Sequence, residues 1–297
     1  MILVTGASGY LGTDLLCALE QRGIPCVPGG RRQGQRFFDL NQPVPEAELL
    51  RGIDVVVHCA GLAHDLGQAD EYQRLNVDGS VALARAAIAA GVGRFVFVSS
   101  LNVVPASAEQ PTLPPESWSA PPGPYAHSKW LAEQRLAALF STGDSELIIV
   151  RPALMYDQQL HGNLERLKRM PPIRLPERGK RSMVARPDVV NVLLDLVTCR
   201  PVADPPVRYC AITDGQTYTA KRISSALVPG RALTLPESVW SLLIYLLEAS
   251  PLRSGRALVR SLAEEHWTAS DGKPTPPGAR RSLEALQCAA AKGKTKQ

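Results

Sequence analysis

Tyr125 and Lys129 stand four residues apart at the start of a segment whose periodicity predicts a helix. This spacing places both side chains on one face of that helix. A free tyrosine has a pKa of about 10 and is a poor base at neutral pH, but a nearby ammonium favours the phenolate and lowers that pKa. The pair is therefore suited to proton transfer near neutral pH, although a tyrosine and a lysine at this spacing also occur by chance on exposed helices.

Ser100 is a third candidate for the same chemistry. It follows residues 94–99 (RFVFVS), which predict a strand. Its hydroxyl would stand at the carboxyl end of that strand, where it could hydrogen-bond the substrate oxygen that exchanges a proton with Tyr125. The three side chains together indicate an acid–base site.

A glycine-rich turn lies between the first predicted strand and the first predicted helix, with glycines at positions 6, 9 and 12. One glycine allows a tight turn, a second lets the backbone approach a pyrophosphate, and the third lets the helix pack closely on the sheet. The N–H groups at the helix N-terminus would then face the phosphates. A plain strand–helix turn would use glycines too, but the position between these two elements favours dinucleotide binding.

The elements that must position these residues alternate between strand and helix. Strands are predicted at 2–5, 24–27, 54–59, 94–99, 146–150 and 207–212, and helices at 10–22, 71–90, 125–140 and 187–198. This order predicts an α/β fold, a doubly wound parallel sheet of the Rossmann type with right-handed crossovers. The segment 105–124 holds seven prolines and is predicted to be a loop.

Two domains are expected from this pattern, which loosens after residue 151. Residues 1–151 with 186–213 would form the NAD(P)-binding domain. Residues 152–185 with 214–297 would form a smaller substrate-binding lobe that is short and irregular in its elements and ends in a basic tail.

The composition is that of an ordinary folded protein. Of the 297 residues, 45% are apolar and 21% are charged, which excludes a chain that is disordered throughout. No apolar run reaches the length of a membrane span. No secretory signal precedes the first strand, so the expected location is the cytoplasm.

The cysteines, histidines and charges favour neither a metal nor a nucleic acid. The six cysteines form no CxxC pair, so free thiols in a reducing compartment are expected. The five histidines lack metal-ligand spacing, so no metal is expected. The net charge is +5, and part of it comes from a basic end without interleaved aromatic residues, which does not indicate nucleic-acid binding. That end contains Arg280, Arg281, Lys292, Lys294 and Lys296.

The GxxGxxG spacing of the turn resembles that of the short-chain dehydrogenase/reductase superfamily. Further residues of the same resemblance are His58-Cys59-Ala60-Gly61, Asn76, Ser99-Ser100 and Tyr125-Ala126-His127-Ser128-Lys129. The resemblance covers roughly residues 1–215 and is similar to the extended branch that modifies nucleotide sugars, which includes UDP-hexose 4-epimerases and 4-ketosugar reductases. It implies an NAD(P)-dependent enzyme.

The resemblance also implies roles for individual residues. The catalytic residues would be Ser100, Tyr125 and Lys129, and Lys129 would also hold the nicotinamide ribose. The cofactor-binding residues would be Gly6, Ser8, Gly9, Tyr10, Leu11, Gly12, Arg31, Arg32, Asp39, Leu40, Ala60, Gly61, Asn76, Tyr125 and Lys129. The substrate-binding residues would be Ser100, Asn163 and Arg181, with Arg181 on a diphosphate. Asn76 as a solvated helix residue and Arg181 as a surface arginine are the alternatives, and Asp188 would cap a helix.

The choice between NAD and NADP depends on the loop after the second strand. An NAD site usually has an acid there for the ribose 2′-OH, but this loop reads Gly29-Gly30-Arg31-Arg32. Two arginines could pair with a 2′-phosphate instead, which favours NADP over NAD. The alternative is that Arg31 and Arg32 belong to a solvated loop.

Three functions follow from these residues. Dehydratases of this branch carry an Asp-Glu pair where this chain has Leu101-Asn102, so 4,6-dehydration is not expected. Hydride transfer at C4 of a UDP-linked hexose remains, and the missing ribose acid favours a 4-ketosugar reductase over a 4-epimerase with tightly bound NAD. A non-catalytic NAD(P)-binding sensor or scaffold is the third possibility. The expected partner is a nucleotide sugar, a homodimer is possible, and residues beyond about 230 match the branch poorly.

Overall fold

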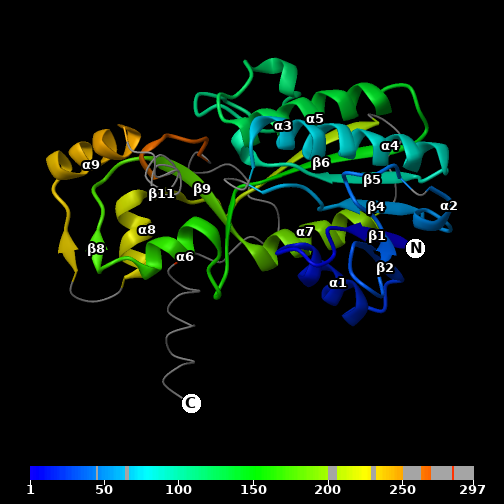
Figure 1. The fold of residues 1–297 in the computed structure, drawn as a ribbon, viewed down its shortest axis with the longest axis horizontal. Helices are drawn as coiled ribbons and strands as arrows, with labels where there is room; N and C mark the ends of the chain where they lie inside the picture. The colour runs from blue at the N-terminus through cyan, green and yellow to red at the C-terminus, as the bar shows by residue number, and fades with distance from the viewer. Residues whose placement is uncertain are drawn as a thin grey trace, which may run out of the picture. The chain divides into compact units, whose positions relative to one another are not determined.

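The computed structural model describes residues 1–44, 46–63, 67–199, 206–228, 232–249, 262–268 and 283. The chain divides into two compact units (Figure 1). Unit 1 contains Met1–Pro105, Glu109–Pro152 and Val189–Ile212, and unit 2 contains Ala106–Ala108, Ala153–Asp188 and the described residues from Thr213 onward. The basic residues of the tail lie outside the described residues. No helix within the described ranges is long and apolar enough to cross a membrane.

Unit 1 is built on a seven-stranded sheet in the order β10-β6-β5-β4-β1-β2-β3. Every neighbouring pair of strands in it is parallel. The strands are β1 (Ile2–Thr5), β2 (Cys26–Gly30), β3 (Arg36–Phe37), β4 (Val55–His58), β5 (Arg94–Val98), β6 (Glu146–Pro152) and β10 (Val207–Ile212). The chain runs outward from β1 in one direction, then returns and runs outward from β4 in the other. The predicted doubly wound parallel sheet is confirmed, and its switch point lies between β1 and β4.

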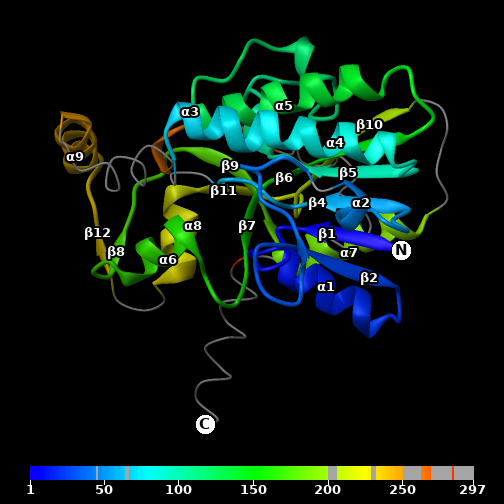
Figure 2. The ribbon, with the colours of Figure 1, turned by 45° about the vertical axis from the view of Figure 1, so that its right-hand side comes forward.

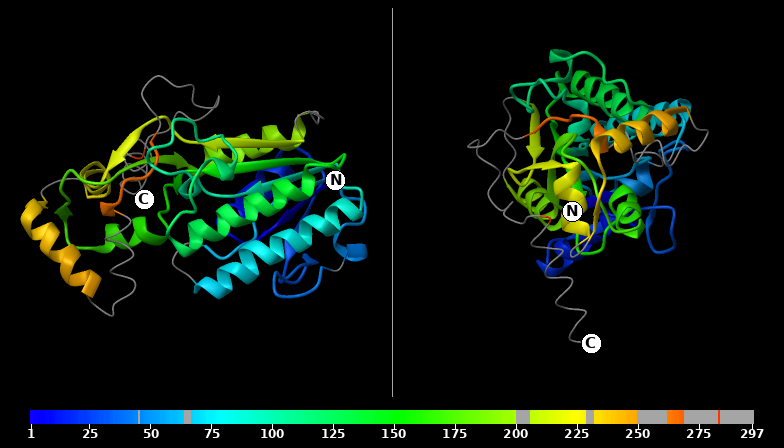
Figure 3. Two further views of the ribbon diagram at one scale, coloured as in Figure 1. Left: turned by 90° about the horizontal axis from the view of Figure 1, so that it is seen from above. Right: turned by 90° about the vertical axis from the view of Figure 1, so that its left-hand side faces the viewer.

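Helices cover both faces of this sheet. Figure 2 shows α3, α4 and α5 over one face and α1 with α7 over the other, and Figure 3 shows α4 and α5 side by side. The helices are α1 (Gly12–Gln21), α2 (Glu46–Leu49), α3 (Ala69–Tyr72), α4 (Gly79–Ala89), α5 (Pro124–Phe140) and α7 (Arg186–Thr198). Because both faces are covered, the central strands read as continuous apolar runs, and every residue of β1, β5 and β6 is buried.

The boundaries of α1 and α4 follow from two glycines. Gly23 and Gly91 adopt positive φ angles of 65° and 73° just after these helices, a conformation that only glycine reaches without strain. Pro124 opens α5 at its first position, where its missing N–H costs nothing. α1 and α4 end within one residue of their predicted C-terminal ends at 22 and 90, and α5 begins one residue before its predicted start at 125.

The described residues of unit 2 include two small sheets and the helices α6, α8 and α9. One sheet has the order β11-β9-β7 and the other pairs β12 with β8. The elements are β7 (Leu154–Tyr156), α6 (Gly162–Arg169), β8 (Ile173–Arg174), β9 (Lys180–Ala185), β11 (Thr217–Thr219), α8 (Ala220–Leu227), β12 (Leu233–Thr234) and α9 (Glu237–Ala249). A shared apolar core includes Leu164, Leu167, Ile223 and Leu227 from the facing sides of α6 and α8.

Three predictions about elements were wrong. The single helix expected at 71–90 is instead α3, a π-helical turn (Gln73–Asp78) and α4. The second strand begins two residues later than expected and is followed by the short strand β3, which was not predicted. The region from 152 onward is more regular than expected, because β8, β9, β11 and β12 gain their backbone partners from residues distant in sequence. The loop 105–124 contains one 3-10 turn, Pro115–Ser117.

Candidate active site

The glycine turn at the carboxyl end of β1 leaves no room for side chains. A Cβ on Gly6 would lie 2.7 Å from the Ala60 nitrogen, and a Cβ on Gly12 would lie 2.3 Å from the Gly6 carbonyl oxygen. Gly6 also has a φ of 68°. The turn therefore brings the backbone of β1 against the Ala60-Gly61 backbone that follows β4, at the switch point of the sheet. Ser8 and Gly9 remain exposed at the start of α1, so the structure fits a pyrophosphate at this helix terminus.

The loop after β2 stands next to this turn. Gly29 pairs with Thr5 in the sheet, and its carbonyl oxygen accepts a hydrogen bond from the Ala7 nitrogen at 3.5 Å. Arg31 and Arg32 follow directly and are exposed. The two guanidinium groups therefore belong to the loop beside the glycine turn, where a ribose 2′-phosphate would lie in a dinucleotide site.

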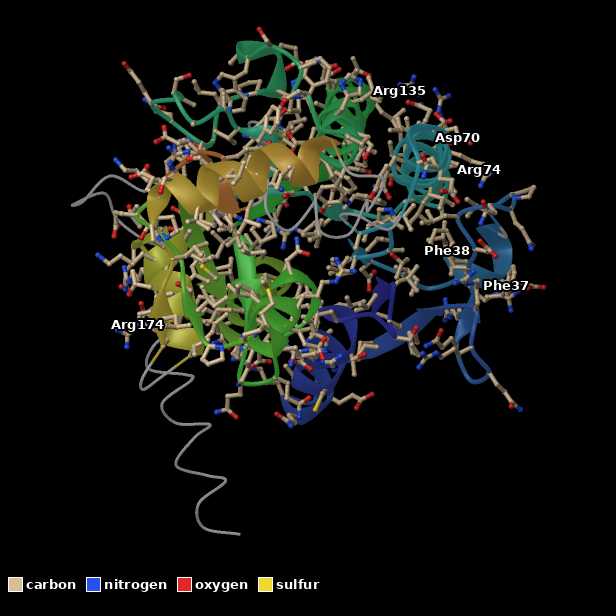
Figure 4. The ribbon with its side chains drawn as sticks, turned by 60° about the vertical axis from the view of Figure 1, so that its left-hand side comes forward. Phe37, Phe38, Asp70, Arg74, Arg135 and Arg174 are labelled. Atoms are coloured by element: carbon tan, nitrogen blue, oxygen red, sulfur yellow. The ribbon has the colours of Figure 1, made fainter. Side chains whose placement is uncertain are left out.

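Asp39 and Leu40 come after β3, on the same edge of the sheet. The Asp39 carboxylate accepts a hydrogen bond from the Asn41 nitrogen at 3.0 Å, and Leu40 packs against the core of unit 1. Figure 4 shows the neighbouring Phe37 and Phe38 at the β3 edge. Phe38 is buried with its ring 6.1 Å from that of His58, which holds this stretch against the sheet.

Ser100, Tyr125 and Lys129 come together at the carboxyl end of β5. The Ser100 hydroxyl is hydrogen-bonded to the Tyr125 side chain, and both Ser100 and Lys129 are buried. The Lys129 ammonium donates to the Val98 carbonyl oxygen at 3.0 Å and lies 4.7 Å from the centre of the Phe97 ring. A Cβ on Gly61 would lie 3.5 Å from Lys129 Nζ, so the same cluster borders the backbone after β4.

Burial decides the charge states of Tyr125 and Lys129. Burial raises the pKa of Tyr125 to about 12; the hydrogen bond from Ser100 opposes this rise and Tyr72 adds to it. Burial lowers the pKa of Lys129 to about 8, although Cys59 and Glu133 raise it. The expected lowering of the tyrosine pKa by Lys129 was therefore wrong, because the ammonium is engaged by the Val98 carbonyl and desolvation of the phenolate dominates. Tyr125 is a neutral phenol at pH 7, ready to donate a proton.

Asn76 joins the loop after β4 to helix α5. Its side-chain oxygen accepts from the Leu62 nitrogen at 2.7 Å, and its amide donates to the Leu62 carbonyl at 3.0 Å and to the Ser128 hydroxyl at 3.1 Å. Ser128 in turn donates to the Tyr125 carbonyl at 2.8 Å. Asn76 is fully buried in the π-helical turn, so it is not a solvated helix residue. These bonds fix the backbone that carries Tyr125 and Lys129.

A buried ion pair lies one helical turn beyond Lys129. Glu133 and Arg151 have no exposed surface, and the Arg151 Nε donates to both Glu133 carboxylate oxygens at 3.1 and 3.2 Å. Arg151 also donates to the carbonyl oxygens of Pro111 and Leu113 at 2.8 and 2.7 Å. The pair therefore ties α5 and β6 to the proline-rich loop that separates Ser100 from Tyr125 in the sequence.

His58 links the glycine turn to α4. Its two ring nitrogens lie 2.7 Å from the Thr5 hydroxyl and 2.9 Å from the Ser80 hydroxyl. Burial, together with Lys129, lowers the pKa of His58 to about 3. A neutral imidazole therefore connects the ends of β1 and β4 beneath the candidate cofactor site.

The sequence missed Glu133, Arg151 and the connecting role of His58. A glutamate four residues after Lys129 was the available signal for Glu133, because it shares a helix face with the Tyr–Lys pair. An arginine ending the apolar run 146–150 was the signal for Arg151, since a buried guanidinium needs an acidic partner.

Arg181 and Asn163 belong to unit 2. Arg181, in β9, is 7% exposed, and burial lowers its pKa to about 10 while Glu264 raises it. Its Nη2 atom has no hydrogen-bond partner within the described residues. A buried, unsatisfied guanidinium nitrogen is a rare feature that an anionic ligand would satisfy. Asn163 lies in the first turn of α6, and its side-chain oxygen accepts from Arg166 at 3.3 Å. Asp188 lies in the first turn of α7.

The described part of the chain contains no cluster of three or more His, Cys, Asp or Glu side chains that could hold a metal ion.

The sheet, the glycine turn and the Ser–Tyr–Lys cluster define an enzyme of the extended short-chain dehydrogenase/reductase type. Residues 2–176 match the model of the NAD dependent epimerase/dehydratase family. The chain belongs to this family, which confirms the predicted family resemblance and the predicted enzyme class.

Two relatives and one solved structure illustrate the similarity. A UDP-glucose 4-epimerase of Vibrio cholerae is 30% identical over 81% of this chain and 77% of its own. A ceramide reductase of Caulobacter vibrioides is 31% identical over 91% of this chain and 86% of its own. MoeE5 in complex with UDP-glucuronic acid and NAD has a TM-score of 0.72, with 23% identity over 99% of both chains. At that identity the structural likeness supports the fold alone.

Proposed function

We propose that this protein uses NADPH to reduce the 4-keto group of a UDP-linked hexose. The observation that carries the proposal is the pair of exposed arginines, Arg31 and Arg32, in the loop where an NAD site usually has an acid. Two guanidinium groups there favour NADPH, the coenzyme that a one-way reduction consumes. Reduction of a ketone also needs a proton donor at the carbonyl oxygen, and the Tyr125 phenol, which is hydrogen-bonded to Ser100, would supply it.

In the proposed reduction, each residue of the site would have a separate role. The bound coenzyme would supply the hydride to the carbonyl carbon. Tyr125 donates its phenolic proton to the carbonyl oxygen as negative charge develops there, and the Ser100 hydroxyl hydrogen-bonds the same oxygen. The Lys129 ammonium would hold the nicotinamide ribose, and Asn76 and Ser128 hold the backbone on which these side chains stand.

The proposed substrate class rests on Arg181 and on the family. A buried guanidinium with an unsatisfied Nη2 atom suits a diphosphate, which every UDP-sugar carries. The Vibrio cholerae relative is named for a UDP-sugar, UDP-glucose. Asn163 is proposed as a second contact to the nucleotide.

The choice of coenzyme gives a first testable prediction. Changing Arg31 and Arg32 together to alanine should weaken NADP(H) binding about tenfold or more relative to NAD(H), because each arginine that pairs with the 2′-phosphate contributes a charge-assisted hydrogen bond. The ratio of the two dissociation constants, measured by titration, is the readout, since damage to the fold affects both coenzymes alike. Arg85→Ala, at an exposed position on α4, is the matched control and should leave the ratio unchanged.

If the wild-type chain binds NAD(H) more tightly, or if the double variant keeps the wild-type ratio, Arg31 and Arg32 are solvated loop residues. The proposal would then move to the 4-epimerase, which retains NAD through a complete turnover.

The pH dependence of the reduction gives a second prediction. The pKa of Lys129 is lowered to about 8 and that of Tyr125 is raised to about 12. Below pH 8 the lysine is charged and the tyrosine is a phenol, so kcat/KM should be flat from about pH 6 to 7.5. Above pH 8 the ammonium loses its proton and kcat/KM should decline, by about tenfold per pH unit. A rate of reduction that rises with pH across this range would contradict the roles assigned to both residues.

A lipid ketone is the second candidate substrate. One observation favours it: the similarity to the Caulobacter vibrioides ceramide reductase covers 91% of this chain. The same Ser–Tyr–Lys chemistry would reduce a ketone on a long-chain lipid, and only the groups that bind the rest of the substrate would differ.

One experiment separates these functions. The purified chain is incubated with UDP-4-ketohexoses, UDP-hexoses and a long-chain lipid ketone, each with NAD(H) and with NADP(H), and the products are analysed by mass spectrometry and NMR. We expect NADPH oxidation only with the 4-ketohexose and formation of a single C4 epimer. Interconversion of UDP-hexoses without net coenzyme use would identify an epimerase. Coenzyme binding without turnover of any substrate would identify a sensor.

A further inference from the structure

Residues 98–100, at the carboxyl end of β5, each form a hydrogen bond with one side chain of α5. The three pairs are Val98–Lys129, Ser99–Glu133 and Ser100–Tyr125. The three α5 residues are spaced by four positions and therefore share one face of the helix. The end of the strand and this face of the helix are thus connected at each of these residues, and the middle pair is the one that the proposed reaction does not use.

The Ser99–Glu133 pair is closed to substrate and coenzyme. The Ser99 hydroxyl donates to the Glu133 carboxylate at 2.5 Å. Ser99 is 3% exposed and Glu133 has no exposed surface, so neither side chain touches a reacting atom. Any effect of this pair on the reaction is therefore exerted through the residues that it holds.

Glu133 provides Ser99 with a fixed partner. Its two carboxylate oxygens accept from Arg151 Nε at 3.1 and 3.2 Å, and Arg151 is itself held by the carbonyl oxygens of Pro111 and Leu113. The carboxylate already has a cationic partner, so the bond from Ser99 is not needed to compensate the buried charge. What that bond adds is a defined distance between the end of β5 and α5.

The backbone leaves the sheet directly after Ser99. The Ser99 nitrogen still donates to the Val150 carbonyl of β6 at 2.7 Å. Ser100 begins the 3-10 turn Leu101–Val103, and its hydroxyl accepts from the Asn102 nitrogen at 3.2 Å. Ser99 is thus held by both β6 and α5 immediately before the chain turns, and a displacement of Ser99 would be passed on to the Ser100 hydroxyl.

We propose that Ser99 is a positioning residue, which through its bond to Glu133 sets the place of the Ser100 hydroxyl in the site. A reacting group displaced by about 1 Å can lose about a hundredfold in rate although no group is removed. The proposal rests on the roles proposed above for Ser100 and Tyr125. It applies to reduction and to epimerisation alike, because both reactions exchange a proton with a substrate oxygen at these two hydroxyls.

The test is Ser99→Ala in the full chain, with the substrate that the wild type turns over in the experiment described above. We expect kcat per coenzyme-binding site to fall by about tenfold to a hundredfold. The dissociation constant of the coenzyme should be unchanged, because the glycine turn and Lys129 keep their contacts. Ser145→Ala is the matched control: its hydroxyl donates to the Val92 carbonyl at 2.8 Å just before β6 begins, at the other end of the sheet, and kcat should stay at the wild-type value.

Glu133→Gln separates the hydrogen bond from the charge. A serine hydroxyl both donates and accepts, so Ser99 keeps a bond to either orientation of the amide, whereas the ion pair with Arg151 is lost. This variant should therefore unfold at a lower temperature than Ser99→Ala but retain a higher kcat. The rates are compared at about pH 6.5, because removing the Glu133 charge lowers the pKa of Lys129 further.

Three results would overturn the proposal: wild-type kcat in Ser99→Ala, an equal loss of kcat in Ser145→Ala, or a kcat in Glu133→Gln as low as that of Ser99→Ala. If Glu133→Gln does not fold, the two serine variants decide. Failure of the proposed function is seen separately. A wild-type chain that interconverts UDP-hexoses or reduces the lipid ketone would contradict the proposed substrate, while the serine variants would still test Ser99. Coenzyme binding without turnover of any substrate would overturn both proposals.

Discussion

Replacing Tyr125 by phenylalanine should lower turnover by about 10² to 10⁴-fold, the range for a positioned acid–base group. The change removes the phenolic proton and the hydrogen bond with Ser100 but keeps the ring that meets Tyr72 edge-on at 5.9 Å. The fold and the glycine turn should therefore survive. The measurement is kcat for reduction at saturating coenzyme, with coenzyme binding measured separately.

Tyr72→Phe is the matched control for this variant. Tyr72 is buried, and its hydroxyl donates to the Ala63 carbonyl at 2.8 Å, so the substitution removes a neighbouring phenol without touching the proton donor. Its turnover should fall by less than about tenfold, the range of one neutral hydrogen bond. Wild-type turnover in Tyr125→Phe, or equal losses in the two variants, would remove Tyr125 from the reaction.

The sheet of unit 1 could be predicted because short segments of sequence identify its strands and the glycines that end the helices between them. Each of β1, β4, β5 and β6 is a short apolar run, and the two glycines after α1 and α4 end their helices by a conformation that other residues resist. The strand β3 could not be predicted in this way. It has two residues and exists because Gly29 and Gly30 pair with Arg36 and Phe37.

The break between α3 and α4 could not be predicted from the sequence for a different reason. The apolar spacing from 71 to 90 continues through the π-helical turn, because one additional residue in a turn hardly disturbs a periodicity of 3.6. What holds the turn is the Asn76 side chain on the Leu62 backbone, a contact between residues 14 positions apart. Such π turns occur often at functional sites.

The features of the candidate site also fall into those that local sequence predicts and those that depend on the folded structure. Ser100, Tyr125, Lys129 and the glycines could be found from sequence because their spacing follows from one turn and one helix. The charge states could not, because they depend on burial: the same Tyr–Lys spacing on an exposed helix would leave both pKa values near their ordinary range. The partner of Arg151 also depends on the fold, since α5 and β6 come into contact only in the packed unit.

Removing Arg151 should destabilise unit 1 more than any other change to its charged residues considered above. Arg151→Met leaves the Glu133 carboxylate buried without its partner and should lower the free energy of unfolding by about 3–5 kcal/mol. It also frees the carbonyl oxygens of Pro111 and Leu113. Amide hydrogen exchange of the β6 backbone is the appropriate measurement, because it reports on unit 1 alone.

A double-mutant cycle separates the ion pair from the packing around it. Glu133→Leu alone leaves the Arg151 guanidinium buried without its partner, whereas Glu133→Leu/Arg151→Met removes both charges. The loss of stability in the double variant should therefore be smaller than the sum of the losses in the two single variants, by about 1–3 kcal/mol. It should still be less stable than the wild type, since Arg151 also lies 4.7 Å from the Tyr209 ring and bonds the loop carbonyls. Strict additivity would mean that Glu133 and Arg151 act independently.

The surface pair Asp78–Arg135 provides the comparison. Its atoms approach to 2.8 Å, but the two side chains are 52% and 46% exposed, and Arg135 stands at the outside of α5 in Figure 4. Arg135→Met should therefore change the stability by less than about 1 kcal/mol, because water screens and replaces the lost partner. If Arg135→Met and Arg151→Met cost the same, burial would not be what makes the Glu133–Arg151 pair matter.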